Sequence, residues 1–344
     1  MTQRAHGGPD ASGQSPFDFS TNANACGPCP SALAAVLAAD ARSYPDPAYR
    51  ALRDSLARHH GVDVARIVPA ASASEAILRI TARAVQRGVT GVSVPEFAYG
   101  DYRHAAEAWS LPVHARGQRH AAGAATLAWA CDPSSPLGLA DAPAASVAAS
   151  TLVVDRAYAP LRLSGADPWR AHAGLAWQLW TPNKALGMTG IRAAYLIAPE
   201  GGEDEAAALD RLAPSWPIGS HGVAMLDAWC HDEARTWLAQ SLDTLRAWKS
   251  AQQALCDSLG WQPLRSDANF FVARLPEGTP ADLLARLREQ GVQLRDCASF
   301  GLPGHVRLGV LPPPAQQALA DAVGGAAGGS GGGATTMHAP NPWK

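Results

Sequence analysis

The segment TPNKALGMTGIR, residues 181–192, contains Lys184, and lysine is rare in this chain. Of the 28 Lys and Arg residues only three are Lys, namely Lys184, Lys249 and Lys344. A lysine amine can act as a nucleophile toward a carbonyl carbon, whereas the permanently charged guanidinium of Arg cannot. Lys344 is the last residue, and Lys249 lies in a helical pattern typical of a solvated face. Lys184 is therefore predicted to have a chemical role.

Apolar runs on both sides of this segment alternate with helical patterns. LVVD at 152–155 and AAYLIA at 193–198 are typical of buried strands. Strands alternating with helices over residues 60–210 predict an α/β domain with a mostly parallel sheet flanked by helices. NFFVARL at 269–275, followed by a helix and two further strands, predicts a second, smaller C-terminal α/β domain.

The expected organisation has four parts. An N-terminal segment (1–45) precedes a large domain (46–240) and a small domain (241–323). Residues 324–344 are rich in Gly and of low complexity, so we expect them to be disordered.

Composition excludes several classes of partner. The 28 basic and 30 acidic residues give a net charge of −2, so the chain carries no electrostatic signature of nucleic-acid binding. No apolar run approaches the roughly 18 residues of a membrane-spanning helix, and the first twenty residues lack the apolar run of a secretory signal. We therefore expect a cytoplasmic protein without a membrane partner.

Two of the six cysteines form the motif Cys26-Gly-Pro-Cys29. The motif allows a redox pair, or a loop that leads into a helix starting at Ser31. The segment before it is polar and rich in turns, unlike the buried strand that precedes a thioredoxin-type pair, so the loop is favoured. No second Cys or His pair has the spacing of a metal site, and no metal is expected.

Asp155 ends the strand predicted at 152–155, and Tyr158 follows three residues later. Ligands of open parallel sheets bind at the carboxyl ends of the strands. Lysine, carboxylate and phenol are groups that pyridoxal 5′-phosphate needs. Lys184 would bind the aldehyde covalently, Asp155 would hold the pyridine nitrogen protonated, and Tyr158 would hydrogen-bond the ring O3′. These three residues are the predicted catalytic group.

The phosphate of this cofactor would need anion-binding groups. Thr181 offers a hydroxyl and Arg192 a planar guanidinium. The helix predicted at 74–87 offers backbone N–H groups at its start, beside Ala73 and Ser74.

DRAY at 155–158 and the segment 181–192 resemble signatures of fold-type I pyridoxal-phosphate enzymes of the aminotransferase class. The resemblance covers residues 4–322. It implies that the ring of Tyr99 stacks on the cofactor and that Ser135 occupies the place of a family Asn that binds O3′. It also implies that Tyr44 of the partner subunit reaches the phosphate, and hence a homodimer.

The small domain resembles the histidinol-phosphate aminotransferase branch of that class. The N-terminal motifs HGG at 6–8 and FDFSTNANACGP at 17–28 resemble instead the L-threonine-O-3-phosphate decarboxylases of cobalamin biosynthesis, in which this segment folds over the substrate as a lid. That resemblance implies that His6, Asn22 and Arg295 bind the phosphate of a phosphorylated amino acid, and that Arg307 binds its carboxylate.

The sequence thus predicts decarboxylation of L-threonine O-3-phosphate to (R)-1-aminopropan-2-yl phosphate. The alternative is an aminotransferase acting on histidinol phosphate or a related amino acid. A third reading is a binding protein that has kept the fold and lost the chemistry, because Ser135 and Ala70-Ala71 depart from the family pattern.

Overall fold

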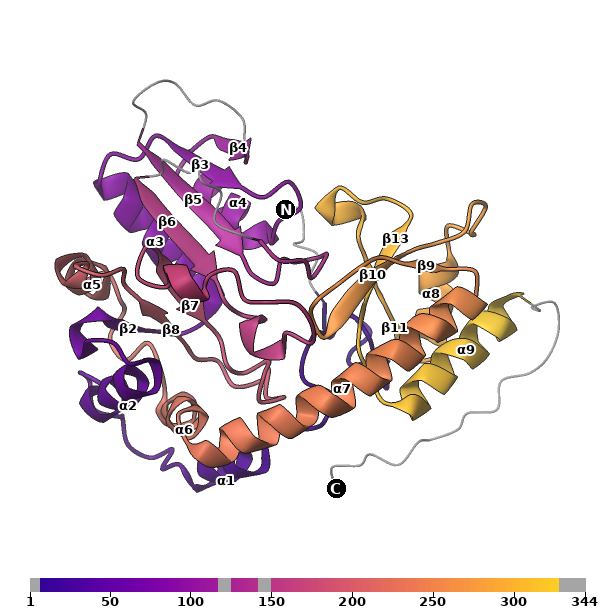
Figure 1. The fold of residues 1–344 in the computed structure, drawn as a ribbon, viewed down its shortest axis with the longest axis horizontal. Helices are drawn as coiled ribbons and strands as arrows, with labels where there is room; N and C mark the ends of the chain where they lie inside the picture. Colours follow the sequence, from indigo (N-terminus) through magenta and orange to yellow (C-terminus); the bar gives the residue numbers. More distant parts are fainter. Residues whose placement is uncertain (1–6, 117–124, 142–149, 328–344) are drawn as a thin grey trace. The chain divides into compact units, whose positions relative to one another are not determined.

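The computed structural model describes residues 7–116, 125–141 and 150–327 (Figure 1). The chain divides into two compact units. The large unit comprises Ala23–Arg246 and Arg265–Asn269, and the small unit comprises Met1–Asn22, Ala247–Leu264 and Phe270–Lys344.

The large unit is built on a seven-stranded sheet with the strand order β2-β8-β7-β6-β5-β3-β4. Neighbouring strands from β7 to β4 run parallel, and β8 is antiparallel to both β2 and β7. The sheet is therefore mostly parallel, as predicted. The strands are β2 (Ile67–Ala70), β3 (Gly91–Val94), β4 (Val113–Ala115), β5 (Thr126–Cys131), β6 (Thr151–Asp155), β7 (Trp177–Trp180) and β8 (Ala194–Ile197).

Helices flank this sheet, which confirms the predicted fold class (Figure 1). They are α1 (Pro30–Ala38), α2 (Arg50–His60), α3 (Ala73–Gln86), α4 (Gly100–Ala108), α5 (Glu203–Asp210) and α6 (Ser220–Trp229). The buried side chains of α3, among them Ile77 and Ile80, join Leu127 of β5 and Leu179 of β7 in the main core.

The small unit contains the antiparallel sheet β12-β13-β10-β9 and a parallel pair, β1 with β11. Its strands are β1 (Phe17–Asp18), β9 (Gln262–Pro263), β10 (Phe270–Arg274), β11 (Val292–Gln293), β12 (Arg295–Asp296) and β13 (His305–Gly309). Its helices are α8 (Leu283–Glu289) and α9 (Pro313–Ala327), and α7 (Asp232–Ser258) contributes residues to both units.

The observed division differs from the expected one. Phe17 pairs with Val292 and Phe19 is fully buried in the core of the small unit, so the chain up to Asn22 belongs to that unit and not to a separate N-terminal segment. The later boundary falls within α7, after Arg246, instead of at 240. Residues 324–327 continue α9, whereas we expected the tail to begin there, and 328–344 lie outside the described residues.

Over the described ranges, no helix is long and apolar enough to cross a membrane.

Candidate active site

The carboxyl end of β6 presents a buried carboxylate, Asp155, which is 4 % exposed. Tyr102 Oη donates a hydrogen bond to Asp155 Oδ2 at 2.8 Å, and the backbone N–H of Ala157 donates to Oδ1 at 2.9 Å. Burial raises the pKa of the Asp155 carboxyl, while both hydrogen bonds and the nearby charge of Lys184 favour its ionised form. Asp155 therefore has a fixed orientation at the strand end, as a partner for a ring nitrogen needs.

Tyr102 is a site residue that the sequence interpretation missed. It is fully buried, and its ring stacks on Trp129 with the centroids 4.6 Å apart. Burial and the charge of Asp155 raise the pKa of Tyr102 well above its ordinary value, so its hydroxyl stays protonated and can donate. The spacing from Tyr99 was the available signal, because residues three apart share one face of a helix.

Tyr99 and Ser74 extend this group of contacts. The Tyr99 hydroxyl donates to Asp101 Oδ2 at 2.8 Å and lies 3.4 Å from Ser74 Oγ. Its ring meets Tyr102 edge-on, with the centroids 5.8 Å apart. The structure thus brings together the start of α3, the start of α4 and the end of β6, three places that the sequence predicted separately.

Lys184 lies in the loop after β7, with Nζ 5.5 Å from the centroid of the Tyr158 ring. Its carbonyl oxygen accepts hydrogen bonds from the backbone N–H of Asn24 at 2.9 Å and of Gly187 at 3.2 Å. Gly187 has φ +69°, and a Cβ there would lie 2.2 Å from the carbonyl oxygen of Gly27. The loop that carries Lys184 is therefore held against residues 24–27 by contacts that only glycine permits.

The Cys26-Gly-Pro-Cys29 motif forms part of this packing. The N–H of Cys29 donates to the carbonyl of Leu186 at 2.8 Å, and α1 begins at the next residue. Both cysteines are free thiols, and burial raises the pKa of Cys26 to about 11. A thiol so hard to ionise is a poor redox group, which supports the loop interpretation.

The start of α3 and the strand end at Thr181 provide the predicted phosphate-binding groups. Ser72 caps α3, because its hydroxyl oxygen accepts a hydrogen bond from the N–H of Glu75 at 3.1 Å. Thr181 is 5 % exposed, and its hydroxyl has no hydrogen-bond partner among the residues that the structure describes. Arg192 is exposed just before β8. A buried hydroxyl without a partner suits an added acceptor such as phosphate, so the residues present fit pyridoxal 5′-phosphate.

The small unit holds the two predicted substrate arginines. Arg295 on β12 lies directly opposite Arg307 on β13, and the two are 8 % and 7 % exposed. The ring of Phe300 is close to both arginines. Its centroid lies 4.9 Å from the guanidinium carbon of Arg295 and 5.7 Å from that of Arg307. Burial and the charge of Arg307 lower the pKa of Arg295. Two buried like charges side by side favour the binding of an anion.

Three further predicted residues lie within the described part of the chain, and a fourth does not. Asn22, in the small unit, and Ser135, after β5, are both buried. Tyr44 is 78 % exposed and stacks on Trp216 with the ring centroids 4.4 Å apart. His6 lies outside the described residues.

The sequence is similar to those of known proteins. A family model for aminotransferase class I and II matches residues 129–323. The histidinol-phosphate aminotransferase of Symbiobacterium thermophilum is 30% identical over 88% of each chain. Histidinol-phosphate aminotransferase 1 of Bradyrhizobium diazoefficiens is 29% identical over 80% of this chain and 83% of its own.

Solved structures share the fold. The L-threonine-O-3-phosphate decarboxylase of Porphyromonas gingivalis matches with a TM-score of 0.75 and 20% identity, over 90% of this chain and 99% of its own. The histidinol-phosphate aminotransferase of Sinorhizobium meliloti, solved with pyridoxal 5′-phosphate, matches with a TM-score of 0.71 and 20% identity over 88% of each chain.

Proposed function

The chain belongs to the aminotransferase class I and II family and uses pyridoxal 5′-phosphate, and from this membership we propose that it transfers the amino group of a small phosphorylated substrate of the histidinol phosphate type. The buried pair Arg295 and Arg307 is the observation that carries the proposal, because it calls for an anionic substrate. Two relatives that match over 80% and 88% of this chain are named for histidinol phosphate, which supports this substrate class.

Bound in the large unit, pyridoxal 5′-phosphate supplies an aldehyde that bonds to amines and a ring that withdraws electrons from a bond at the substrate Cα. Lys184 would hold the aldehyde carbon and later move a proton at Cα through Nζ. Asp155 would hold a proton at the ring nitrogen, with Tyr102 orienting its carboxylate. Tyr158 would bind the ring hydroxyl.

The remaining predicted residues would bind rather than react. The cofactor phosphate would be bound by Thr181, Ser74, Arg192 and the N–H groups beside Ala73. The ring of Tyr99 would stack on the cofactor, and Ser135 would bind its O3′.

Each of the two arginines would bind a different anionic group. Arg295 would bind the substrate phosphate, together with Asn22 and His6, and Arg307 would bind a carboxylate. Guanidinium forks suit both anions, because each can form two parallel charge-assisted hydrogen bonds. In transamination the carboxylate would belong to the 2-oxo acid that receives the amino group.

Decarboxylation of L-threonine O-3-phosphate is a second candidate, favoured by the packing of the N-terminal motifs. The N–H of Gly8 donates to Ser20 Oγ at 2.8 Å, and a Cβ on Gly7 would lie 2.1 Å from the carbonyl oxygen of Ser20. That same carbonyl accepts from Arg307 at 3.0 Å. The two motifs that resemble the decarboxylases therefore lie together beside a predicted substrate residue.

A comparison of substrates separates the two candidates. We expect histidinol phosphate to lose its amino group only when a 2-oxo acid such as 2-oxoglutarate is present, with the corresponding amino acid as the second product. Release of carbon dioxide from L-threonine O-3-phosphate without any oxo acid would favour the second candidate. No reaction with either substrate by a cofactor-loaded protein would contradict both, and would leave the binding-protein reading.

A further inference from the structure

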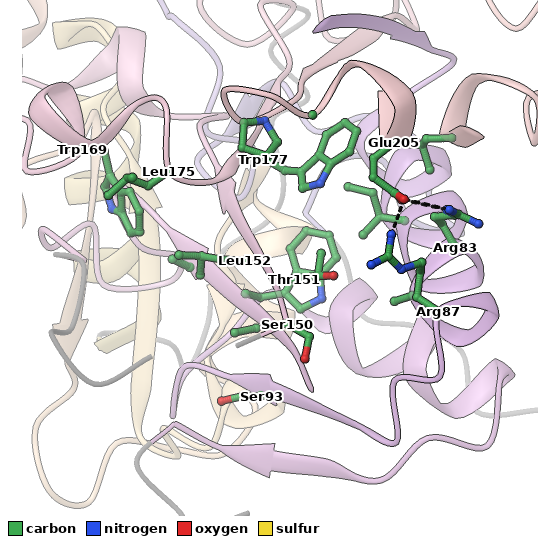
Figure 2. Close-up of a pocket in the computed structure, with 18 of the residues that line it drawn as sticks. Arg83, Arg87, Ser93, Ser150, Thr151, Leu152, Trp169, Leu175, Trp177 and Glu205 are labelled. Atoms are coloured by element: carbon green, nitrogen blue, oxygen red, sulfur yellow. Dashed lines mark hydrogen bonds and ion pairs between the residues drawn. The ribbon is translucent and has the colours of Figure 1, made fainter. Parts of the chain in front are cut away.

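A cavity of about 430 Å³ lies in the large unit at the amino ends of β6 and β7 (Figure 2). Thr151 begins β6 and Trp177 begins β7, and both line the cavity. Asp155 ends β6 four residues further on, and at about 3.3 Å per residue its Cα lies about 13 Å from that of Thr151. Thr151 therefore lies at the opposite end of β6 from the catalytic carboxylate, although Trp129, which also lines the cavity, stacks on Tyr102. The cavity volume falls within the range of about 300–1,000 Å³ typical of small-molecule sites.

One side of the cavity is positively charged. Arg83 binds both oxygens of Glu205, at 3.0 and 2.9 Å, and Arg87 binds the same carboxylate (Figure 2). The hydrogen bond from Arg83 lowers the pKa of Glu205, so that residue stays ionised. Two guanidinium groups thus share one carboxylate, which leaves one positive charge in excess. Arg87 is half-exposed, and its ion pair with Glu205 is the one that the structure shows for it among the described residues.

The other side is apolar. Figure 2 shows Trp169, Leu175 and Leu152 across the cavity from the arginines, with Trp177 and Thr151 between them. Leu175 is 70 % exposed, which leaves a large apolar side chain uncovered beside the cavity. A ligand with an anionic end and an apolar body would match both sides.

Trp129 adds a polar group that needs a partner. It lines the cavity and is fully buried, and its indole N–H has no hydrogen-bond acceptor within the described part of the chain. A buried donor without an acceptor costs free energy, and an acceptor on a bound molecule would remove that cost.

We propose that this cavity is a second ligand site, at the other end of β6 from Asp155, that binds a small aromatic monocarboxylate. The carboxylate binds at Arg87, where the excess positive charge lies, and the aromatic body lies against Trp177 and Leu152. The ligand also provides the acceptor for Trp129 Nε1. Arg116 also lines the cavity but is paired with Asp141, so one carboxylate on the ligand neutralises the one excess charge. The three tryptophans that line the cavity favour an aromatic body.

Calorimetric titration of the cofactor-loaded protein with indole-3-acetate tests the proposal. We expect one site per chain, and at least tenfold weaker binding of indole-3-acetamide, which has the same shape without the charge. The variant Arg87→Gln should lose at least tenfold in affinity. Arg50→Gln is the matched control, because Arg50 is also exposed and paired with one carboxylate, yet lies outside the cavity.

Binding at the substrate arginines is the competing explanation. Under the proposal, Arg307→Gln keeps its affinity for indole-3-acetate and Arg87→Gln does not. Unchanged affinity in Arg87→Gln, equal affinity for the acid and the amide, or no binding at millimolar concentration would each overturn the proposal.

Discussion

At the scale of single residues, the hydrogen bond from Tyr102 to Asp155 determines how the carboxylate at the end of β6 behaves. Tyr102→Phe keeps the stacking on Trp129 and removes only the donor. A hydrogen bond to a charged group contributes about 1.5–3 kcal/mol, and one pKa unit corresponds to about 1.4 kcal/mol. Because the lost bond favoured the ionised form, the pKa of Asp155 should rise further above its ordinary value.

The acid limb of the pH dependence of kcat should therefore move to higher pH in Tyr102→Phe. Tyr195→Phe is a suitable control, since Tyr195 is also fully buried and its hydroxyl contacts His60 and Trp229 instead. An acid limb that does not move in Tyr102→Phe would show that Asp155 is not oriented in this way during turnover.

Lys184 should carry the cofactor. The purified protein should absorb at roughly 410–430 nm. Borohydride reduction should fix the cofactor irreversibly to Lys184, where peptide mass spectrometry would detect it. Lys184→Ala should lose this absorbance and its turnover. Lys249 is 7 % exposed, so the solvated face predicted for it is wrong, and the control is Lys249→Arg, which keeps the charge and should keep both the absorbance and the turnover. A label on Lys249 would contradict the assignment.

Arg295 and Arg307 should have separable effects. Arg295→Ala should cost about 2–4 kcal/mol in kcat/KM for a phosphorylated substrate, because a desolvated anion loses its partner, and should hardly affect the unphosphorylated analogue. Arg307→Ala should weaken the half-reaction with the 2-oxo acid. If Arg295→Ala lowers kcat/KM equally for the phosphorylated substrate and the unphosphorylated analogue, Arg295 has a structural role.

At the scale of elements, the contact between Gly187 and Gly27 fixes the loop that carries Lys184. Gly187→Ala meets both an unfavourable φ and the carbonyl oxygen of Gly27, so we expect it to lower the free energy of unfolding by more than about 1 kcal/mol and to reduce cofactor binding. Gly88→Ala is the control, because Gly88 has φ +79° but no atom within 4 Å of an added Cβ. Denaturant unfolding of both variants measures the difference, and equal losses would show that the contact is unimportant.

The sequence predicted some elements and not others for physical reasons. The runs at β6 and β8 are mostly apolar, and both strands were predicted to within one residue at each end. The four residues of β7 and the alanine-containing β5 were missed, because short apolar runs with few β-branched residues cannot be distinguished from helix by period.

The site shows the same limit. Lys184 and Asp155 were predicted because their motifs are local in sequence. The sequence did not predict that Arg295 and Arg307 lie directly opposite each other. The register of β12 and β13 decides which residues face each other, and the number of residues between the two arginines does not.

At the scale of the whole molecule, exposed Tyr44 leads to a prediction about assembly. If Tyr44 of the partner subunit binds the cofactor phosphate, mixing inactive Tyr44→Phe and Lys184→Ala subunits should restore activity, because a hybrid dimer contains one intact site. We expect recovery of up to about a quarter of wild-type activity from random pairing. A fully active monomer by light scattering would rule out the shared site.

The pairing of β1 with β11 also affects how the protein is made. Phe17 leaves the ribosome 275 residues before its partner Val292, and at about 5–20 residues per second this delay is about 14–55 s. Throughout that time Phe17 and Phe19 lack the strand and core that cover them in the finished protein. Ribosome-bound chains stopped before residue 292 should therefore cross-link to chaperones through this segment, and released full-length chains should not.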